Sequence, residues 1–295
     1  MIQYLNKEKI DIKKWNRCIA SSQCSLPYAY TYYLNIVCKN WGGLVLNHYE
    51  AVMPLPYAFK FGLPYIYQPY FTQQLGIFTA NNIDNDLIQT FLKNIPKKFV
   101  YISTQLNYKC LAAQSIKSIK TRKNCILNLN KPYQELFSRF TENTKRNIKQ
   151  ADKNYLQIKI NVHSATEYAL FYKENNPIEH SKKTNLLLEK IINTTAKNNM
   201  GETWSVHSVQ GQMLAFAHLL KEKNRIIYIA PATSPEGKKQ KAMFLLINEL
   251  CKKNATHHIL LDFEGSEIQN VARFYEGFNA ETELYPIYTK KVFSI

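Results

Sequence analysis

One order of secondary-structure elements occurs twice along this chain. In each half, helical spacing and strand-like alternation predict two helices, an antiparallel hairpin, a strand, a helix and an apolar strand. In the first half the helices are expected at 10–22, 29–40 and 84–95, the hairpin at 42–58, and the strands at 65–78 and 99–104. In the second half, strands are expected at 125–130, 156–162, 225–230, 258–263 and 283–288, a hairpin at 204–220, and helices from 133, then at 164–176, 184–199, 238–254 and 267–278.

The repeat divides the chain into two domains. The 295 residues, 45% of them hydrophobic, are enough for two domains of ordinary size. The segment 120–124 is short, polar and basic, so we expect domains at 1–122 and 123–295. The apolar segment 258–263 should be a central strand of the second domain, covered on both faces.

The net charge restricts the partners. A formal charge of +16 and a pI near 9.4 attract nucleotides, coenzyme phosphates, tRNA or anionic membrane surfaces. The lysines are spread over the chain, so a general solubility charge is the alternative interpretation. The six cysteines form no Cys-x-x-Cys pair, which argues against a disulfide framework or a zinc site. The polar N-terminus and the short apolar runs predict a cytoplasmic protein, with peripheral membrane contact as a compatible property.

A first candidate site is the loop 231–239 with the helix that follows it. A helix N-terminus presents unpaired N–H groups to anions, Gly237 permits a close backbone approach, and Lys238 and Lys239 add positive charge. The alternative is an ordinary basic first turn, although lysines there oppose the helix dipole.

A second candidate lies at the end of the apolar strand. Asp262 and Glu264 are two residues apart, so their side chains should share a face, and Tyr228 on the neighbouring strand should approach Asp262 in a common cleft. A partly desolvated carboxylate can remove a proton from an amine. The alternative is helix capping, which we assign to Glu264, leaving Asp262 for the site.

Two basic features complete the candidates. Lys145 and Lys149 with Arg146 form a positive stripe on the predicted helix that contains 141–153, where a bound anion would relieve their repulsion. A solvated helix face is the alternative. Arg273 on the last helix could bind a carboxylate or phosphate with both guanidinium nitrogens, or lie on a solvated face.

Two segments carry a family resemblance. TENTKRNIKQADK (141–153) resembles the basic helix that opens the second domain of FemAB-like acyltransferases, a branch of the GNAT superfamily of acyl-CoA N-acyltransferases, and LDFEGSEIQNVARFYEGFNA (261–280) resembles its last strand–helix unit. The first half matches in layout, through MPLP (53–56) and QPYFTQQLGIF (68–78). The resemblance implies an α/β (α+β) fold of two tandem GNAT-like domains, each a mixed, mostly antiparallel sheet flanked by helices. It also implies that Tyr275 donates a proton to the leaving group; packing in the core is the alternative for this residue.

The resemblance implies an activity. The chain would transfer an acyl or aminoacyl group from acyl-CoA or aminoacyl-tRNA, used as co-substrate, to an amine such as a cell-wall (peptidoglycan) precursor or an amino sugar. No tightly bound cofactor or metal is implied, and the active site would lie in the second domain. The sequence departs from the usual pattern in SPEGKKQK (234–241), which has a single Gly, and in the shortened Tyr275–Phe278 turn, and both departures weaken the case for acetyl-CoA. The alternative is a non-catalytic tRNA-binding protein on the same fold, with binding that depends steeply on salt.

Overall fold

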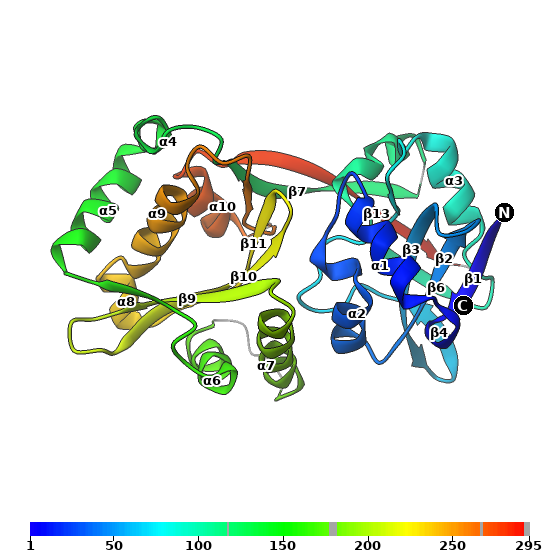
Figure 1. The fold of residues 1–295 in the computed structure, drawn as a ribbon, viewed down its shortest axis with the longest axis horizontal. Coiled ribbons are helices and arrows are strands. Elements are labelled where there is room, and N and C mark those ends of the chain that lie inside the picture. The colour runs from blue at the N-terminus through cyan, green and yellow to red at the C-terminus, as the bar shows by residue number, and fades with distance from the viewer. Residues whose placement is uncertain (117, 177–181, 266–267, 292–295) are drawn as a thin grey trace. The chain divides into compact units, whose positions relative to one another are not determined.

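The computed structural model describes residues 1–116, 118–176, 182–265 and 268–291. The chain forms two compact units: unit 1 comprises Met1–Lys123 together with Glu283–Ile295, and unit 2 comprises Asn124–Thr282. The chain passes from one unit to the other in β7 (Ile119–Asn128) and again in β13 (Glu281–Lys291), as Figure 1 shows. Whereas we expected the second domain to continue to the C-terminus, Ile287–Lys291 pairs with Tyr101–Gln105 of unit 1.

Unit 1 is built on a mixed sheet with the strand order β1-β2-β3-β4-β6-β13. Its strands are β1 (Ile2–Asn6), β2 (Asn40–Leu46), β3 (Ala51–Lys60), β4 (Leu63–Ile66) and β6 (Tyr101–Gln105), with the short β5 (Phe78–Thr79) beside β3. Its helices are α1 (Ile12–Ser21), α2 (Thr31–Val37) and α3 (Asn85–Lys93), with 3-10 turns at Lys7–Lys9, Pro27–Ala29 and Tyr108–Ser115. Asp11 and Asp84 cap α1 and α3 through their carboxylates, which accept from backbone N–H groups of the first turn.

The strand expected at 65–78 is wrong over most of its length. Only its first two residues belong to β4, and Phe78 begins β5. Between them, side-chain amides replace the strand ladder: Gln68 Nε2 donates to Thr72 O (2.8 Å), and Gln68 Oε1 accepts from Gln105 N (3.0 Å). Gln74 Oε1 likewise accepts from Tyr108 N (2.9 Å). Alternating Tyr and Gln therefore encode a loop held by glutamines rather than a half-buried strand.

Unit 2 contains the sheet order β7-β12-β11-β10-β9-β8. The remaining strands are β8 (Gln157–Ile160), β9 (Gly201–His207), β10 (Met213–Glu222), β11 (Arg225–Thr233) and β12 (Leu260–Asp262). β12 runs parallel to β11 and antiparallel to β7, and the other pairs are antiparallel. The prediction of a central strand at 258–263 is confirmed in position, since β12 lies between two strands and Leu261 is fully buried.

Helices cover both faces of the unit 2 sheet. α4 (Tyr133–Arg139), α5 (Glu142–Lys153), α9 (Ala242–Asn254) and α10 (Gln269–Glu276) lie on one face, and α6 (Ala165–Asn175) and α7 (Lys182–Lys197) on the other (Figure 1). The helix expected at 238–254 is interrupted: α8 (Pro235–Lys239) ends before Lys241, whose left-handed backbone (φ 61°) precedes α9. No helix in the described part of the chain is long and apolar enough to cross a bilayer.

A buried ion pair joins the central strands of unit 2. Arg225 Nη1 on β11 donates to Asp262 Oδ2 on β12 at 2.5 Å, and both side chains are 3% exposed. Asp262 Oδ1 accepts from Asn124 Nδ2 on β7 and from the backbone N–H of Glu264, both at 2.9 Å. Asn124 Oδ1 accepts from Gly265 N (3.1 Å). The network ties three adjacent strands and the turn after β12 to one carboxylate.

We expect Asp262→Asn to lower the free energy of unfolding by about 3 kcal/mol, because the variant removes one charge of a buried, hydrogen-bonded ion pair. Urea denaturation at neutral pH measures the effect. The matched control is Glu249→Gln, which breaks a surface pair with Lys252 (2.5 Å) and should change stability by less than about 1 kcal/mol. Equal effects of the two substitutions would contradict a stabilising role for the network.

Candidate functional site

The two parallel strands of unit 2 separate after a short contact. β11 and β12 pair only where Arg225–Ile227 lies beside Leu260–Asp262, and β11 then continues to Thr233. The β10–β11 register shifts beyond Ile229, and Ala230 has φ 48°, which is a β-bulge with one extra residue on β11. No described strand pairs with β11 on the β12 side past Ile227. We call this divergence the β11–β12 fork. It leaves backbone groups of β11 open at a strand switch point, where open sheets bind ligands.

An aromatic cluster lines the α10 side of the fork. The ring of Tyr275 stacks on Phe263 (centroids 4.3 Å apart), and Tyr228 meets both rings edge-on, at 5.8 Å from Phe263 and 6.2 Å from Tyr275. Tyr228 donates to Met243 Sδ (2.7 Å), so its hydroxyl is used inside the core, and burial raises its pKa. The structure thus gives Tyr228 a packing role.

Tyr275 is 4% exposed, and no hydrogen bond from its phenol to the described residues is observed. Burial raises the pKa of this phenol well above its usual value, with a further contribution from the negative charge of Glu264. The phenol therefore stays protonated at neutral pH. The sequence left two alternatives for Tyr275, packing in the core and proton donation. The ring is packed in the core, and the protonated phenol keeps this residue a candidate donor.

Glu264 lies just past the end of β12, half-buried, with a left-handed backbone (φ 47°). Its charge contributes, after burial, to the raised pKa of Tyr275 on α10 and of Tyr172 on α6, which reaches about 12. These helices cover opposite faces of the sheet (Figure 1), and Glu264 follows the end of β12, where the β11–β12 pairing stops. The expected capping role is not observed, because α10 begins at Gln269 with Ile268 at its N-cap.

The structure corrects the surroundings expected for Asp262. The β11–β12 register pairs Asp262 with Ile227, so strand alternation puts Tyr228 on the opposite face, and the predicted common cleft of Tyr228 and Asp262 is wrong. Both oxygens of Asp262 accept hydrogen bonds from Arg225, Asn124 and the backbone of Glu264. A carboxylate held in this way organises the turn that carries Glu264.

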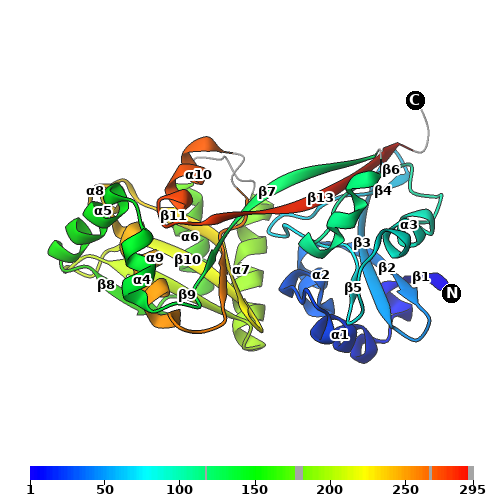
Figure 2. The same ribbon diagram turned by 90° about the horizontal axis from the view of Figure 1, so that it is seen from above.

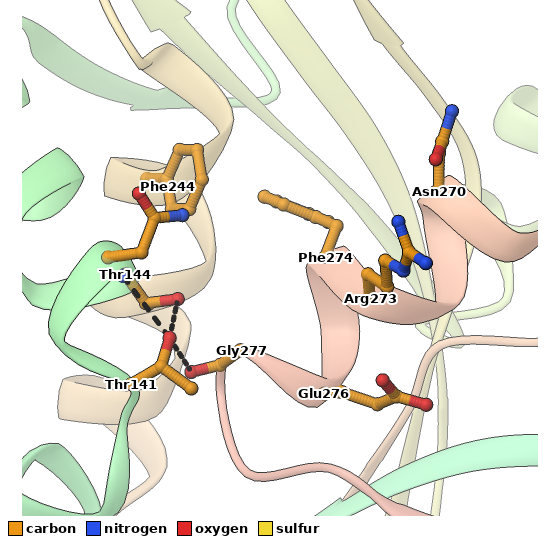
Figure 3. A pocket seen from close by; sticks show the side chains of 9 residues that line it. Thr141, Thr144, Phe244, Asn270, Arg273, Phe274, Glu276 and Gly277 are labelled. Atoms are coloured by element: carbon orange, nitrogen blue, oxygen red, sulfur yellow. Dashed lines mark hydrogen bonds between the residues drawn. The ribbon is translucent and has the colours of Figure 1, made fainter.

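A cavity of about 390 Å³ opens between α5, α9 and α10 (Figure 3). Its walls are Thr141, Asn143, Thr144, Phe244, Asn270, Arg273, Phe274, Glu276 and Gly277. Thr141 fixes the start of α5 against the end of α10, because its backbone N–H donates to Gly277 O (3.0 Å). A Cβ on Gly277 would come within 2.5 Å of Thr144 Oγ1, so glycine permits this close approach.

Among the predicted basic residues, Arg273 lines the cavity. It is exposed, and no described carboxylate forms an ion pair with it. Lys145, Arg146 and Lys149 do not line the cavity. Lys145 Nζ bonds Glu142 (2.8 Å), Arg146 Nη2 donates to the lining residue Asn143 (2.8 Å), and Lys149 is exposed. The stripe thus lies outside the cavity, and the Arg146 side chain reaches its wall through Asn143.

The loop around Gly237 is closed by contacts with the Ser234 side chain and with β10. Gly237 N donates to the cap residue Ser234 (3.0 Å), and a Cβ on Gly237 would lie 2.2 Å from Leu214 O of β10. The glycine therefore allows packing against the sheet. Lys238 and Lys239 are exposed, and Lys239 pairs with Glu236 (3.5 Å). α9, which follows, has no side-chain cap at its N-terminus.

Most of the cavity wall is not recognisable from the sequence pattern: Thr141, Asn143, Thr144, Phe244, Asn270, Phe274, Glu276 and Gly277. The available signal was the spacing of Asn270, Arg273 and Glu276 at successive i,i+3 steps, which places a polar row on one face of α10. The described residues contain no cluster of three or more His, Cys, Asp or Glu side chains suited to a metal ion. All six cysteines are buried thiols.

No family model and no curated protein matches the sequence. Solved structures nevertheless share the fold over nearly the whole chain. FemX superposes with a TM-score of 0.69 at 12% identity, covering 96% of each chain. A tandem GNAT protein from the clavulanic acid biosynthesis pathway gives 0.54 at 8% identity over 100% of both chains, and L-PGS from Bacillus licheniformis gives 0.53 at 12% identity over 86% of this chain and 85% of its own. The chain therefore has the mixed α/β, FemAB-like fold of two tandem GNAT domains, as the resemblance of its sequence predicted.

Proposed function

We propose that this chain is an N-acyltransferase that moves an acyl or aminoacyl group from acyl-CoA or aminoacyl-tRNA to an amine acceptor. The observation that carries the proposal is the β11–β12 fork of unit 2, where a half-buried carboxylate, Glu264, and a protonated phenol, Tyr275, lie at the end of a split parallel pair. The FemAB-like fold supports it.

The chemistry of the fork fits direct transfer. An amine attacks a carbonyl only after it has lost a proton, and Glu264 is placed to accept that proton. The open backbone N–H groups of β11 beyond Ile227 can stabilise the oxyanion of the tetrahedral intermediate. Tyr275 can then protonate a leaving hydroxyl oxygen, or donate a hydrogen bond to a leaving thiolate, which is the weaker base. In this assignment Asp262, with Arg225, positions Glu264 and takes no proton itself.

The donor would approach from the basic side of unit 2. The uncapped N-terminus of α9 follows Lys238, Lys239 and Lys241, a combination that suits phosphate groups of either coenzyme A or tRNA. Arg273 supplies a free guanidinium in the cavity on the α9–α10 side. The acceptor would be a cell-wall precursor or another amino sugar, in a protein that works in the cytoplasm.

Direct titration of the pure chain with acetyl-CoA and, separately, with bulk tRNA tests the donor. Saturable binding of either one at near-physiological salt is expected. tRNA binding without turnover of aminoacyl-tRNA, and with a steep salt dependence, would identify the non-catalytic alternative. Binding of neither would contradict the proposal.

Arg273→Ala should weaken donor binding at least about tenfold, because a guanidinium–phosphate or guanidinium–carboxylate contact typically contributes a charge-assisted hydrogen bond of more than 1 kcal/mol. The measurement is the dissociation constant of the donor identified by titration. Arg17→Ala removes the same charge from an exposed position on α1 of unit 1 and should leave the constant unchanged. Equal weakening in both variants would indicate only a general charge effect.

Glu264→Gln should lower kcat about a hundredfold and Tyr275→Phe about tenfold, with little loss of stability, since they remove the proposed base and acid. The readout is single-turnover transfer from the identified donor to a pool of amino sugars and cell-wall precursors. Tyr228→Phe is the control, because it removes an equally buried phenol whose hydroxyl bonds Met243. Full activity of Glu264→Gln would exclude this residue as the base.

A further inference from the structure

The hairpin between β3 and β4 of unit 1 ends in an apolar tip. Phe59, Phe61 and Leu63 are 58%, 93% and 45% exposed, within five consecutive residues. The register pairs Lys60 with Leu63, so Phe61 and Gly62 form a two-residue turn. The side chains project from both faces of the ribbon, because Leu63 shares its face with Lys60 and Phe59 shares the other with Tyr57.

The backbone conformation at the first position of this turn is unfavourable for a phenylalanine. Phe61 has φ 51° and Gly62 has φ 76°, as a two-residue hairpin turn requires at both positions. Asn is the residue that tolerates the first position, and a bulky aromatic there is strained. Because Phe61 is almost fully exposed, it gains no burial within unit 1 to offset this strain.

A group of lysines lies at the same end of the sheet as the tip. β4 and β6 run parallel, Val100 N donates to Pro64 O (3.0 Å), and Lys291 at the end of β13 pairs with Tyr101. The loop 96–100 with Lys97 and Lys98, and the end of β13 with Lys290 and Lys291, therefore lie at the same end of the sheet as the tip (Figure 2). Lys60, whose Nζ lies 5.7 Å from the ring centroid of Phe61, belongs to the tip itself. We call these five lysines the lysine collar.

Aromatic contacts connect the collar to the tip. Lys98 Nζ lies 5.2 Å from the ring centroid of Phe99 and 5.9 Å from that of Tyr57, and Tyr57 meets Phe59 edge-on at 5.7 Å. Burial raises the pKa of Tyr4 on β1 to about 12, with smaller contributions from Tyr57 and Glu8. The chain between 51 and 134 contains only two carboxylates, Asp84 and Asp86, both at the start of α3. The surface thus combines exposed rings with positive charge.

We propose that the β3–β4 tip docks this protein on an anionic lipid bilayer, with Phe61, Phe59 and Leu63 inserted at the level of the headgroups and the lysine collar against the lipid phosphates. Aromatic rings favour this interface, and lysines near it are attracted by the negative surface potential. A protein partner with a neutral apolar groove would offer no negative charge to complement the lysine collar. The attachment is peripheral and reversible, because three side chains bury little apolar area.

Flotation of the full chain with vesicles tests the proposal. Vesicles of phosphatidylcholine with 30% phosphatidylglycerol, a proportion of about one anionic lipid in three chosen to give a strong surface potential, should bind the wild type, and pure phosphatidylcholine vesicles should bind it far less. Phe59→Ser/Phe61→Asn should reduce the partition coefficient about tenfold or more, because two large apolar side chains no longer enter the interface. Lys60→Gln/Lys97→Gln should weaken binding to anionic vesicles and flatten its dependence on salt.

Tyr155→Asn is the matched control. Tyr155 of unit 2 is also an exposed aromatic (79%) with a left-handed backbone (φ 50°), but it follows Asp152 and lies on a different unit. This variant should float like the wild type. Phe61→Asn suits the turn better than phenylalanine, so it should keep or raise the thermal stability, and lost flotation would not reflect unfolding.

An added tryptophan reports insertion directly. The three native tryptophans are at most 3% exposed, so a Phe61→Trp variant adds the exposed fluorophore, and its emission should shift to the blue on anionic vesicles. Three results would overturn the proposal: no flotation of the folded wild type, equal flotation of Phe59→Ser/Phe61→Asn and wild type, or self-association through the tip in sedimentation velocity with no vesicle binding.

Discussion

The end of the β11–β12 pairing in unit 2 depends on one buried ion pair. Arg225 at the first and Asp262 at the last paired position join β11 to β12, and beyond Asp262 the two strands separate. A charge pair in this position is costly to desolvate, and it persists because Asn124 and the backbone of Glu264 satisfy the remaining acceptor capacity of the carboxylate. The pair and its hydrogen-bonded partners thus hold the turn that presents Glu264, where the strand pairing ends.

The surroundings of Asp262 and Glu264 distinguish two carboxylates that the sequence pattern does not distinguish. Asp262 and Glu264 are both carboxylates at the end of an apolar strand. The first is fully enclosed by donors and holds the backbone, whereas the second is half-buried and faces two phenols whose pKa values its charge helps to raise. Because a base must reach its substrate, the enclosed carboxylate is the less suited of the two.

The basic residues of the chain have different surroundings in the structure. Arg273 opens into a cavity, Lys145 and Arg146 are bonded along α5, and the lysine collar lies at the same end of the sheet as the apolar tip of unit 1. A single net charge of +16 is therefore compatible with a donor that carries phosphate and with a lipid surface that carries phosphate. These sites lie on separate compact units, so each can be altered without changing the other.

The sequence by itself determined most of the order of elements and the central position of β12, because local periodicity and an unbroken apolar segment set these features. The tandem GNAT-like fold was implied by the resemblance of two segments to FemAB-like acyltransferases, and solved structures with that fold confirm it. It also identified Arg273, Tyr275 and Glu264 as candidates. Only the tertiary structure decided that Tyr228 and Asp262 lie on opposite faces, since this depends on the register of two strands more than thirty residues apart. It also decided that glutamine side chains replace a strand after β4 and that Gly237 packs against Leu214, because such contacts join positions distant in sequence and leave no local periodicity.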